Sequence, residues 1–349
     1  MRVMLSAAIV LASLTVATAG FCQGKTLRIG NYGGLFTELT NKCAGDLFTS
    51  RTGVKVQYLD GNPTDHLSKL LATQGREAPM DLVYLDDGPY AQGSDAQLFE
   101  KLDPEIVTNL RHLYPIARMK GDISAAVNTS SVGLAYNTKI LKEKGIPEPT
   151  SWADLWNPKL AGRIALPDIT TSAGMNMVTV AAWQVGGDEQ NLKNAFQKLA
   201  EIKPLYFFKS SADLKTKFQS GDAWVAPWYN GRAWQLIGEG FPMKFIYPDK
   251  RGFSQLTTIN VIKGTKLSKE AMAYVDAQLD PLAQLCMATY LPYGPTNSTL
   301  EGVMYAYPKM SQQFPSPEDL KGRMYVANWS VINRDFPKWL EAWNRTVVK

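Results

Sequence analysis

Residues 26–58 read TLRIGNYGGLFTELTNKCAGDLFTSRTGVKVQY, and this stretch determines the fold that we predict for the chain. Residues 26–30 alternate as a half-buried strand does, and residues 31–34 (NYGG) are typical of a turn. Residues 35–51 carry apolar side chains at helical spacing, and residues 54–58 return to a strand pattern. A strand, a helix and a second strand in this order indicate an α/β fold.

The next segment extends the α/β pattern and locates the first candidate ligand residues. Residues 65–74 have the pattern of a helix, and residues 80–85 form an apolar strand that ends at Asp86 and Asp87. Strands that alternate with helices form a parallel sheet, and the ligands of such sheets lie beyond the carboxyl ends of the strands. This rule indicates that the turn at 31–34 and the two aspartates contribute to a ligand site.

A second α/β pattern occupies the middle of the chain. An apolar strand at 132–137 leads into a proline-containing stretch, and residues 162–166 begin a new strand. The loop at 167–174 (PDITTSAG) follows this strand and precedes a predicted helix. A further strand at 256–262 comes before a mostly helical C-terminal part. About 330 residues remain after the N-terminal segment, which is the size of two domains.

The N-terminus predicts export. A short basic start and an apolar run at 3–16 precede Ala17-Thr18-Ala19, which supplies the small residues that a signal peptidase recognises. We therefore predict a signal peptide at residues 1–19, cleaved after Ala19, and a periplasmic protein.

The chain has three cysteines, which can form a disulfide in an oxidising compartment. Cys22, Cys43 and Cys286 are an odd number, so one disulfide is possible and one thiol is left over. We prefer the pair Cys43–Cys286, because Cys22 lies in a terminus that we expect to be flexible. The alternative is that all three thiols are free.

The composition argues against several classes of function. The formal net charge of +5 is spread along the chain, without the basic stripe that nucleic acid binding requires. The chain has two histidines and no G-x-S-x-G, H-E-x-x-H, P-loop or Cys/His metal spacing. We therefore expect no nucleic acid, cofactor or metal as partner, and no enzymatic activity. A secreted enzyme that uses two carboxylates is the competing hypothesis, because such chemistry needs no histidine.

Several short motifs, in their order along the chain, carry a resemblance to a known family. They are IGNYGG at 29–34, MDLV at 80–83, GLAYN at 133–137, SWADLWNP at 151–158, GDAW at 221–224, WYNG at 228–231 and YGPTN at 293–297. Together they make the chain similar to the periplasmic solute-binding proteins of ABC importers, and most similar to the spermidine/putrescine-binding branch.

The resemblance implies a type II-like periplasmic binding protein fold, in which crossover hinge strands join two α/β lobes that close on a ligand. Lobe 1 would combine residues 26–135 with residues 262–349, and lobe 2 would comprise residues 136–261. The closed protein, acting as a monomer, would deliver a small-molecule ligand to an ABC permease and its ATPase.

The resemblance also implies a set of ligand contacts. Polyamine-binding relatives hold amines with acidic residues and sandwich the carbon chain between aromatic rings. The positions that we predict to contact the ligand are Tyr32, Asp86, Asp87, Ser172, Trp228, Tyr229, Arg232, Thr257 and Tyr293. Asp86 or Asp87 would receive an amine, and Trp228 and Tyr32 would contact the carbon chain.

The chain departs from the polyamine pattern in two places. The acidic residue of the family's late crossover strand is replaced within residues 256–259 (LTTI), and that of the lobe 2 loop within residues 171–173 (TSA). Small hydroxyl side chains at a helix start suit an anionic oxygen, and an arginine can clamp an acid. We therefore predict a small zwitterion, such as an aminoalkanoate or aminophosphonate, with its acid at Arg232 and Ser172.

Polyamine, ferric iron and thiamine binding stay as alternatives. Iron binders of the wider superfamily use adjacent tyrosines near the position of Tyr229. This chain has a single tyrosine there, between Trp228 and Asn230, which argues against iron.

Overall fold

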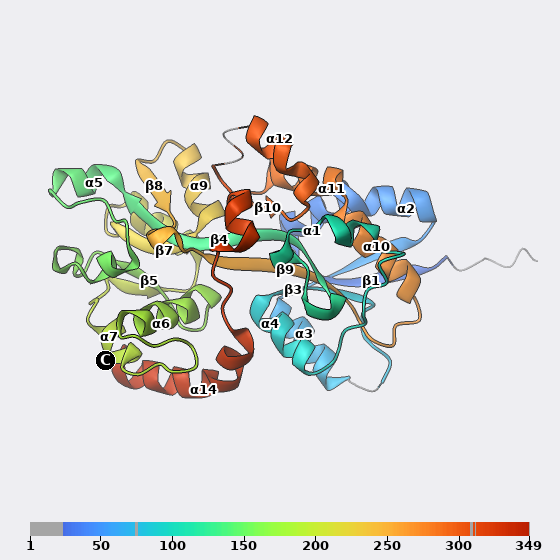
Figure 1. Cartoon of the computed structure of the whole chain (residues 1–349), viewed down its shortest axis with the longest axis horizontal. Helices are drawn as coiled ribbons and strands as arrows, with labels where there is room; N and C mark the ends of the chain where they lie inside the picture. The colour runs from blue at the N-terminus through green and yellow to red at the C-terminus, as the bar shows by residue number, and fades with distance from the viewer. Residues whose placement is uncertain (1–23, 74–75, 308–309, 311, 349) are drawn as a thin grey trace, which may run out of the picture.

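The structure is a computed structural model that describes residues 24–348 except for 74–75, 308–309 and 311. The predicted signal peptide at 1–19 lies outside the described residues. The described elements form two lobes that lie side by side and are joined by long strands (Figure 1).

The strands and α-helices have the following bounds. The strands are β1 Thr26–Asn31, β2 Lys55–Asp60, β3 Leu82–Asp86, β4 Ala125–Asn137, β5 Ala165–Pro167, β6 Tyr206–Phe208, β7 Val225–Tyr229, β8 Met243–Ile246, β9 Phe253–Val261 and β10 Gly294–Pro295. The helices are α1 Gly34–Thr40, α2 Asp46–Thr52, α3 Pro63–Ala72, α4 Asp87–Asp95, α5 Thr138–Glu143, α6 Ser172–Gln184, α7 Ala195–Ala200, α8 Ser211–Gln219, α9 Asn230–Gly238, α10 Ser268–Leu279, α11 Pro281–Tyr290, α12 Glu301–Ala306 and α14 Trp329–Thr346.

Lobe 1 is built on the strands of the N-terminal α/β pattern. β1 pairs in parallel with β2 on one side and with β3 on the other, so the predicted parallel sheet is confirmed. The predicted helix at 35–51 consists of α1 and α2, which are joined by a π-helical turn at Asn41–Gly45. Gly53 ends α2 with φ 71, a left-handed conformation that glycine adopts without a Cβ penalty.

Two long strands, β4 and β9, connect the lobes (Figure 1). They pair antiparallel, from Ala125 opposite Ile259 to Val132 opposite Phe253. β3 pairs with the lobe 1 end of β9, whereas β7 and β8 pair with the lobe 2 half of β4. The sheet order β10-β4-β9-β3-β1-β2 is therefore continuous across the molecule. These strands have the arrangement of the predicted crossover hinge strands, and the predicted α/β class is confirmed.

Lobe 2 has its own core. The short strands β5 and β6 pair in parallel beside β7, to which Ile164 is linked by a β-bridge. Helix α6 packs on this layer, and its apolar residues, such as Met177 and Val180, are buried with Leu166 and Val225. The apolar side chains of α6 explain why this helix lies inside the lobe rather than on its surface.

The C-terminal helix α14 packs on lobe 2. Its residues Trp339 and Trp343 are buried in the core cluster of lobe 2, and the helix lies along the lower side of that lobe (Figure 1). The chain reaches this place beside β9, where Tyr325 forms a β-bridge with Phe253. The predicted assignment of all of residues 262–349 to lobe 1 does not hold for α14, because its tryptophans are buried against lobe 2. The remaining lobe boundaries stay a prediction.

Cys43 and Cys286 form a disulfide with a Cα–Cα distance of 5.6 Å, which confirms the preferred pairing. Cys43 lies in the π-helical turn between α1 and α2, and Cys286 lies in α11. The bridge therefore ties the first helical segment of lobe 1 to a helix far along the chain.

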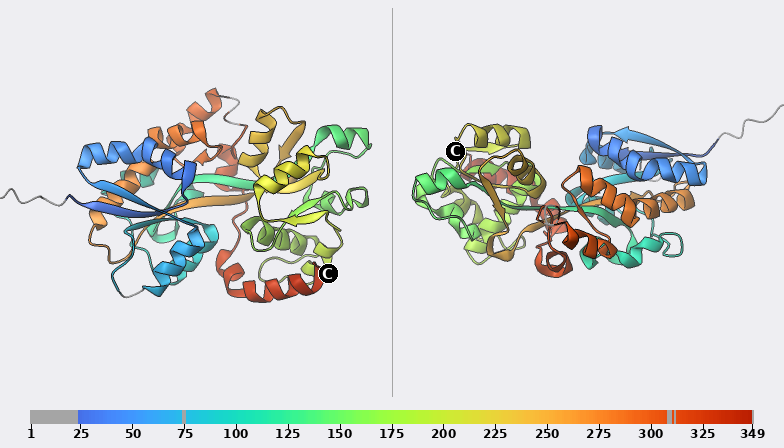
Figure 2. Two further views of the ribbon diagram at one scale, coloured as in Figure 1. Left: turned by 180° about the vertical axis from the view of Figure 1, so that it is seen from behind. Right: turned by 90° about the horizontal axis from the view of Figure 1, so that it is seen from above.

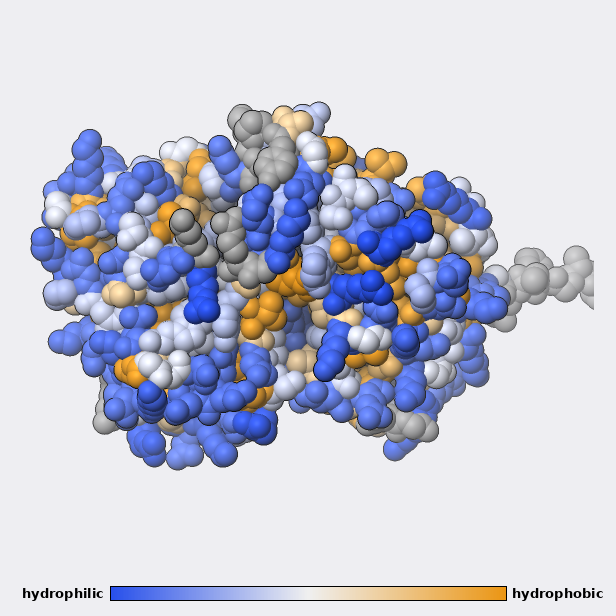
Figure 3. Space-filling view, in the orientation of Figure 1, coloured by the Kyte–Doolittle hydropathy of each residue, from blue (hydrophilic) through white to orange (hydrophobic). Residues whose placement is uncertain are grey.

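The outline of the molecule follows from this arrangement. Seen from above, two masses are joined by a narrow waist (Figure 2), and the space-filling view shows a hollow between them at the lower edge (Figure 3). In the part of the chain that the structure describes, no helix has the length and apolar character needed to span a membrane.

Candidate ligand-binding site

The carboxyl ends of β1 and β3 bring Tyr32 and Asp86 together. The two strands are parallel neighbours, so the residues that follow them lie at one edge of the sheet. The Tyr32 hydroxyl donates a hydrogen bond to Oδ1 of Asp86 at 2.6 Å. Burial raises the pKa of Asp86, and the hydrogen bond from Tyr32 offsets part of that shift. Among the described residues, no cationic side chain forms a salt bridge with Asp86.

Two neighbours fix the position of Tyr32. Thr257 is the register partner of Asp86 in the β3–β9 ladder, and its side chain lies close to the Tyr32 hydroxyl. Gly33 adopts φ 88, which lets the chain turn from β1 into α1 and which other residues rarely adopt. Burial raises the pKa of Tyr32, so its hydroxyl stays protonated and can donate.

Tyr229 reaches the same place from lobe 2. It ends β7, is half-buried, and lies close to the backbone of Ala173 at the start of α6. Burial and the nearby charge of Asp86 raise the pKa of the Tyr229 phenol. The side chain therefore lies within electrostatic range of the lobe 1 carboxylate.

Tyr293 and Arg232 complete this cluster. Burial raises the pKa of Tyr293, whereas Arg232 lowers it and Asp86 raises it further. The Tyr293 ring also packs edge-on against Phe36, with 6.3 Å between ring centroids. The Arg232 side chain is exposed. The predicted contacts that gather around Asp86 are thus Tyr32, Tyr229, Thr257 and Tyr293, and Arg232 lies near Tyr293.

The loop before α6 has a local structure that glycine and hydroxyl residues determine. Thr171 is the N-cap, and its side chain accepts from the Gly174 N–H at 3.0 Å. A Cβ at Gly174 would lie 1.9 Å from the carbonyl oxygen of Asp168, so this position requires glycine. Ser172 is the first residue of α6 and is half-buried beside the residue that contacts Tyr229.

The Trp228 side chain does not join the cluster. It is 1% exposed, its ring stacks on Phe218 with 5.6 Å between centroids, and its indole N–H donates to the Ser211 hydroxyl. Successive residues of a strand point to opposite faces, so Trp228 faces the core of lobe 2 while Tyr229 faces the other way. The predicted contact between Trp228 and the ligand's carbon chain is replaced by core packing.

The Asp87 side chain bonds to the protein backbone, whereas the sequence predicted that it would contact a ligand amine. It is 6% exposed, and its Oδ2 accepts from the Leu256 N–H at 2.9 Å. Burial raises the pKa of Asp87 to about 8. The side chain therefore joins the start of α4 to the crossover strand β9, and the Asp86 side chain has no such backbone partner on β9 among the described residues.

The sequence interpretation did not single out four buried polar residues on α6, β9 and α14: Asn176, Thr179, Gln255 and Trp329. Each has a side-chain polar atom without a hydrogen-bond partner among the described residues. A signal for three of them exists in the sequence. Gln255 is two residues before Thr257 on the same strand, and Asn176 and Thr179 follow Ser172 at helical spacing. The burial of Trp329 depends on the position of α14, which the sequence did not reveal.

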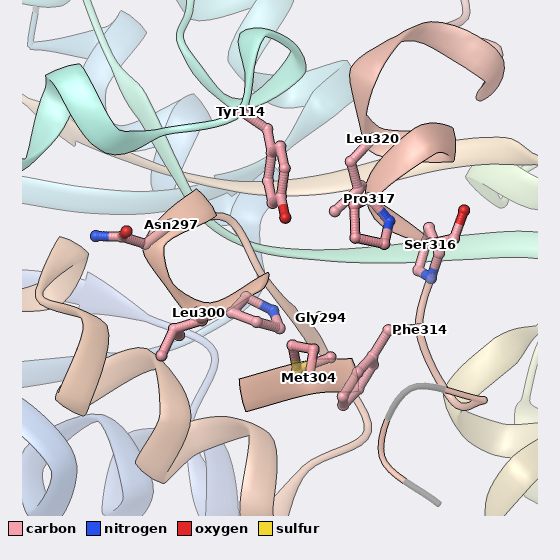
Figure 4. Close-up of a pocket in the computed structure, with 11 residues that line it drawn as sticks. Tyr114, Gly294, Asn297, Leu300, Met304, Phe314, Ser316, Pro317 and Leu320 are labelled. Carbon is pink, nitrogen blue, oxygen red and sulfur yellow. The ribbon is translucent and has the colours of Figure 1, made fainter. Parts of the chain in front are cut away.

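A separate cavity lies beside the hinge. It has a volume of about 170 Å³ and is bordered by β10, α12 and the segment 314–320 (Figure 4). Tyr114, Phe314 and Leu320 are among its lining residues, and its wall is mainly apolar. None of the nine predicted ligand contacts lines this cavity, so it is distinct from the cluster around Asp86.

The described residues contain no group of three or more His, Cys, Asp and Glu side chains that could hold a metal ion. Of the two histidines, His66 is buried with its Nε2 3.1 Å from the Asn31 carbonyl oxygen, and His112 is bonded to Arg111. The cluster consists of one carboxylate, three phenols, a hydroxyl and a guanidinium.

Comparisons with known proteins identify similar sequences. The profile of a family described as bacterial extracellular solute-binding protein matches residues 44–311. The chain is similar to the gamma-aminobutyric acid-binding protein of Pseudomonas aeruginosa, with 24% identity over 323 residues that cover 90% of this chain and 88% of that protein. It is also similar to spermidine/putrescine-binding periplasmic protein 1 of Haemophilus influenzae, with 24% identity over 246 residues, 67% of this chain and 66% of that protein.

The fold is similar to that of an ABC transporter protein from Clostridium perfringens. The crystal structure of that protein matches with a TM-score of 0.81 and 24% sequence identity, over 92% of this chain and 99% of the other. The resemblance that the sequence motifs carry, and the fold class that it implies, are confirmed by these findings.

Proposed function

The chain belongs to the bacterial extracellular solute-binding protein family, and we propose that it is the substrate-binding component of an ABC importer for a small amino-containing solute. The ligand is captured between the two lobes and released to a membrane permease that an ATPase drives. The protein acts in the periplasm as a monomer, after a signal peptide has been cleaved behind Ala19, and it binds its solute without chemical turnover.

The observation that carries this proposal is the carboxylate of Asp86. It is desolvated, it accepts a hydrogen bond from Tyr32, and among the described residues it has no salt-bridge partner. A buried carboxylate is stable in its ionised form only with a cationic or hydrogen-bonding partner. A ligand ammonium group supplies that charge, and Tyr229 and Tyr293 enclose it from two sides.

A zwitterion fits the remainder of the cluster better than a polyamine does. Arg232 lies beside Tyr293, and the hydroxyl of Ser172 lies at the start of α6, where backbone N–H groups suit an anion. One relative of this chain is named as a gamma-aminobutyric acid-binding protein, and gamma-aminobutyric acid is a zwitterion. Polyamine binding is the second candidate, because the chain is also similar to a spermidine/putrescine-binding protein.

Ferric iron is a poor ligand for this site. Iron would need tyrosines that lose their protons, and burial raises the pKa of Tyr32, Tyr229 and Tyr293. Protonated phenols donate hydrogen bonds instead, as Tyr32 does to Asp86. Purified protein that takes up ferric iron and turns coloured would contradict this point.

A thermal-shift screen of the mature protein tests the proposal. The panel consists of ω-amino acids, aminophosphonates, polyamines, thiamine, ferric citrate and organic acids without an amine. A ligand at about 100 times its Kd stabilises the folded protein by about 2.7 kcal/mol, which raises the melting temperature measurably. We expect shifts from amino-containing solutes alone. A shift from amine-free acids and none from amines would refute the role of Asp86.

A further inference from the structure

Four buried side chains on α6, β9 and α14 have polar atoms without partners among the described residues. The atoms are Nδ2 and Oδ1 of Asn176, Oγ1 of Thr179, Nε2 of Gln255 and Nε1 of Trp329. The exposed fractions of these residues are 0%, 0%, 9% and 6%. Buried polar groups are normally hydrogen-bonded, so several unpaired ones in one region indicate a ligand that pairs with them.

Asn176 and Thr179 lie on one stripe of helix α6. Residues 172, 176, 179 and 183 are separated by four, three and four positions, which is the spacing of one helix face. Trp183, the last member of this stripe, stacks on Phe253 of β9 with 5.2 Å between ring centroids. The stripe therefore faces the crossover strand.

Gln255 lies on the side of β9 that faces α6. It is two residues after Phe253, so the two side chains point to the same face of the strand. From the contact at Phe253, β9 leads to Thr257, which lies close to Tyr32, and α6 leads back to Ala173, which lies close to Tyr229. Both segments approach Asp86, and Gln255 therefore lies alongside the polar residues of α6.

Trp329 lies at the side of α14. A Cβ on Gly88 would lie 3.4 Å from Cε3 of Trp329, so this edge of the indole covers the start of α4, two residues after Asp86. Trp329 also belongs to the core cluster that contains Ala173 and Met177 of α6. Its N–H is on the opposite edge of the indole from the one that covers Gly88. Trp329 therefore lies next to the start of α4 and belongs to the same core cluster as α6.

We propose that Asn176, Thr179, Gln255 and Trp329 form the acid subsite, which holds the carboxylate of an ω-amino carboxylic acid through neutral hydrogen-bond donors. The Trp329 indole N–H and the NH2 groups of Asn176 and Gln255 can only donate, and the Thr179 hydroxyl can donate as well. Oδ1 of Asn176 is the one unpaired carbonyl oxygen of the set, so the second ammonium group of a diamine would leave most of these donors unpaired. A carboxylate is acceptor-only and can take several donors at once. This inference rests on the proposed function and narrows the ligand class within it, and it assigns the acid of the ligand to these neutral donors instead of Arg232.

The charge of the subsite separates carboxylates from phosphonates. None of the four side chains is cationic, and the exposed Arg232 is not part of this set. Neutral donors can stabilise one negative charge that is balanced by the ligand's own ammonium group. A second negative charge, as on a phosphonate, would be buried without a counter-charge, which is costly. We therefore expect a carboxylate in preference to a phosphonate of the same chain length.

Isothermal titration of the mature protein at pH 7.5 tests the subsite with four probes. They are 4-aminobutyrate, its amide, putrescine and 3-aminopropylphosphonate. We expect 4-aminobutyrate to bind at least about tenfold more tightly than the other three, since each lacks the single carboxylate charge. Tighter binding of putrescine or of the phosphonate would overturn the subsite and leave the binding function intact. If none of the probes binds, the proposed function itself fails.

Two variants remove one donor each while keeping the packing. Thr179→Val and Trp329→Phe are expected to weaken 4-aminobutyrate binding about tenfold to a hundredfold, because each deletes a hydrogen bond to a charged group. Both variants should unfold at an unchanged temperature without ligand, since the deleted groups have no protein partner. Unchanged affinity in both variants, with 4-aminobutyrate still bound, would overturn the subsite.

Matched controls carry the same substitutions away from the site. Thr216→Val removes a hydroxyl of α8 that donates to the Ala212 carbonyl at 3.2 Å. Trp156→Phe removes an indole N–H that donates to the Lys198 carbonyl at 2.7 Å. Both controls are expected to bind 4-aminobutyrate with the affinity of the unmodified protein. A loss of affinity in the controls as large as in the test variants would overturn the assignment.

Discussion

Replacing Asp86 with Asn removes the charge of the proposed amine site while nearly preserving its shape. The amide oxygen of Asn can still accept the hydrogen bond that Tyr32 donates to Oδ1 at 2.6 Å. A hydrogen bond between a charged donor and a charged acceptor contributes about 1.5–3 kcal/mol. Because about 1.4 kcal/mol is a tenfold change in Kd, Asp86→Asn should weaken 4-aminobutyrate binding about tenfold to a hundredfold.

The same substitution should not lower stability. Burial raises the pKa of Asp86, which means that the folded protein without ligand disfavours the ionised carboxylate. Removing that charge therefore leaves the free energy of unfolding at pH 7.5 unchanged or higher. The two effects have opposite signs, and titration calorimetry together with urea unfolding measures them separately.

The pH dependence of binding follows from the same shift. The ligand amine pairs with the ionised form of Asp86, so affinity should fall as the pH falls through the raised pKa of this carboxyl. The Asp86→Asn variant should lack this dependence. The control is Asp60→Asn, which changes an exposed carboxylate that accepts from Thr37 at 3.0 Å. Equal affinity and equal pH profiles of Asp86→Asn and the unmodified protein would refute the amine site.

Three further predictions concern stability. The pKa of Asp87 is raised to about 8, so this carboxyl binds more protons in the folded protein than in the unfolded chain. The free energy of unfolding should therefore decrease as the pH rises from about 4 to 8. Urea unfolding of Asp87→Asn should show a smaller decrease over the same pH range. The double substitution Cys43→Ala and Cys286→Ala should lower the free energy of unfolding by about 2–5 kcal/mol, with little change in Kd, because the bridge lies within lobe 1. Trp343→Ala should cost about 3–5 kcal/mol in urea unfolding, since the ring is buried in lobe 2; a loss below 1 kcal/mol would show that α14 does not contribute to that core.

The sequence was sufficient for the features that depend on local pattern. Alternation of strands and helices predicted the parallel order of β1, β2 and β3. The rule for strand ends predicted Tyr32 and Asp86, because both follow directly on such strands. The choice between Asp86 and Asp87 needed the structure, since only one of two adjacent side chains can bond to β9 at Leu256.

Other features depend on information that a sequence pattern does not contain. The side to which Trp228 points is set by the register of β7 on β4, and a shift of one residue would exchange Trp228 with Tyr229. The position of α14 depends on a third crossing beside β9, where Tyr325 meets Phe253. A helix that follows several lobe 1 helices in sequence gives no sign of such a crossing. Both errors are therefore errors of long-range geometry and not of residue chemistry.

The two halves of the site explain why one ligand should favour closure. Asp86 is held by lobe 1, and the polar stripe of Asn176 and Thr179 belongs to lobe 2. A ligand changes the balance between open and closed forms only by its difference in affinity for them. A solute with an amine alone would contact one lobe and leave the donors of the other unpaired. A solute with an amine and a carboxylate satisfies both lobes only when they are closed, so its full binding energy appears in the closed form.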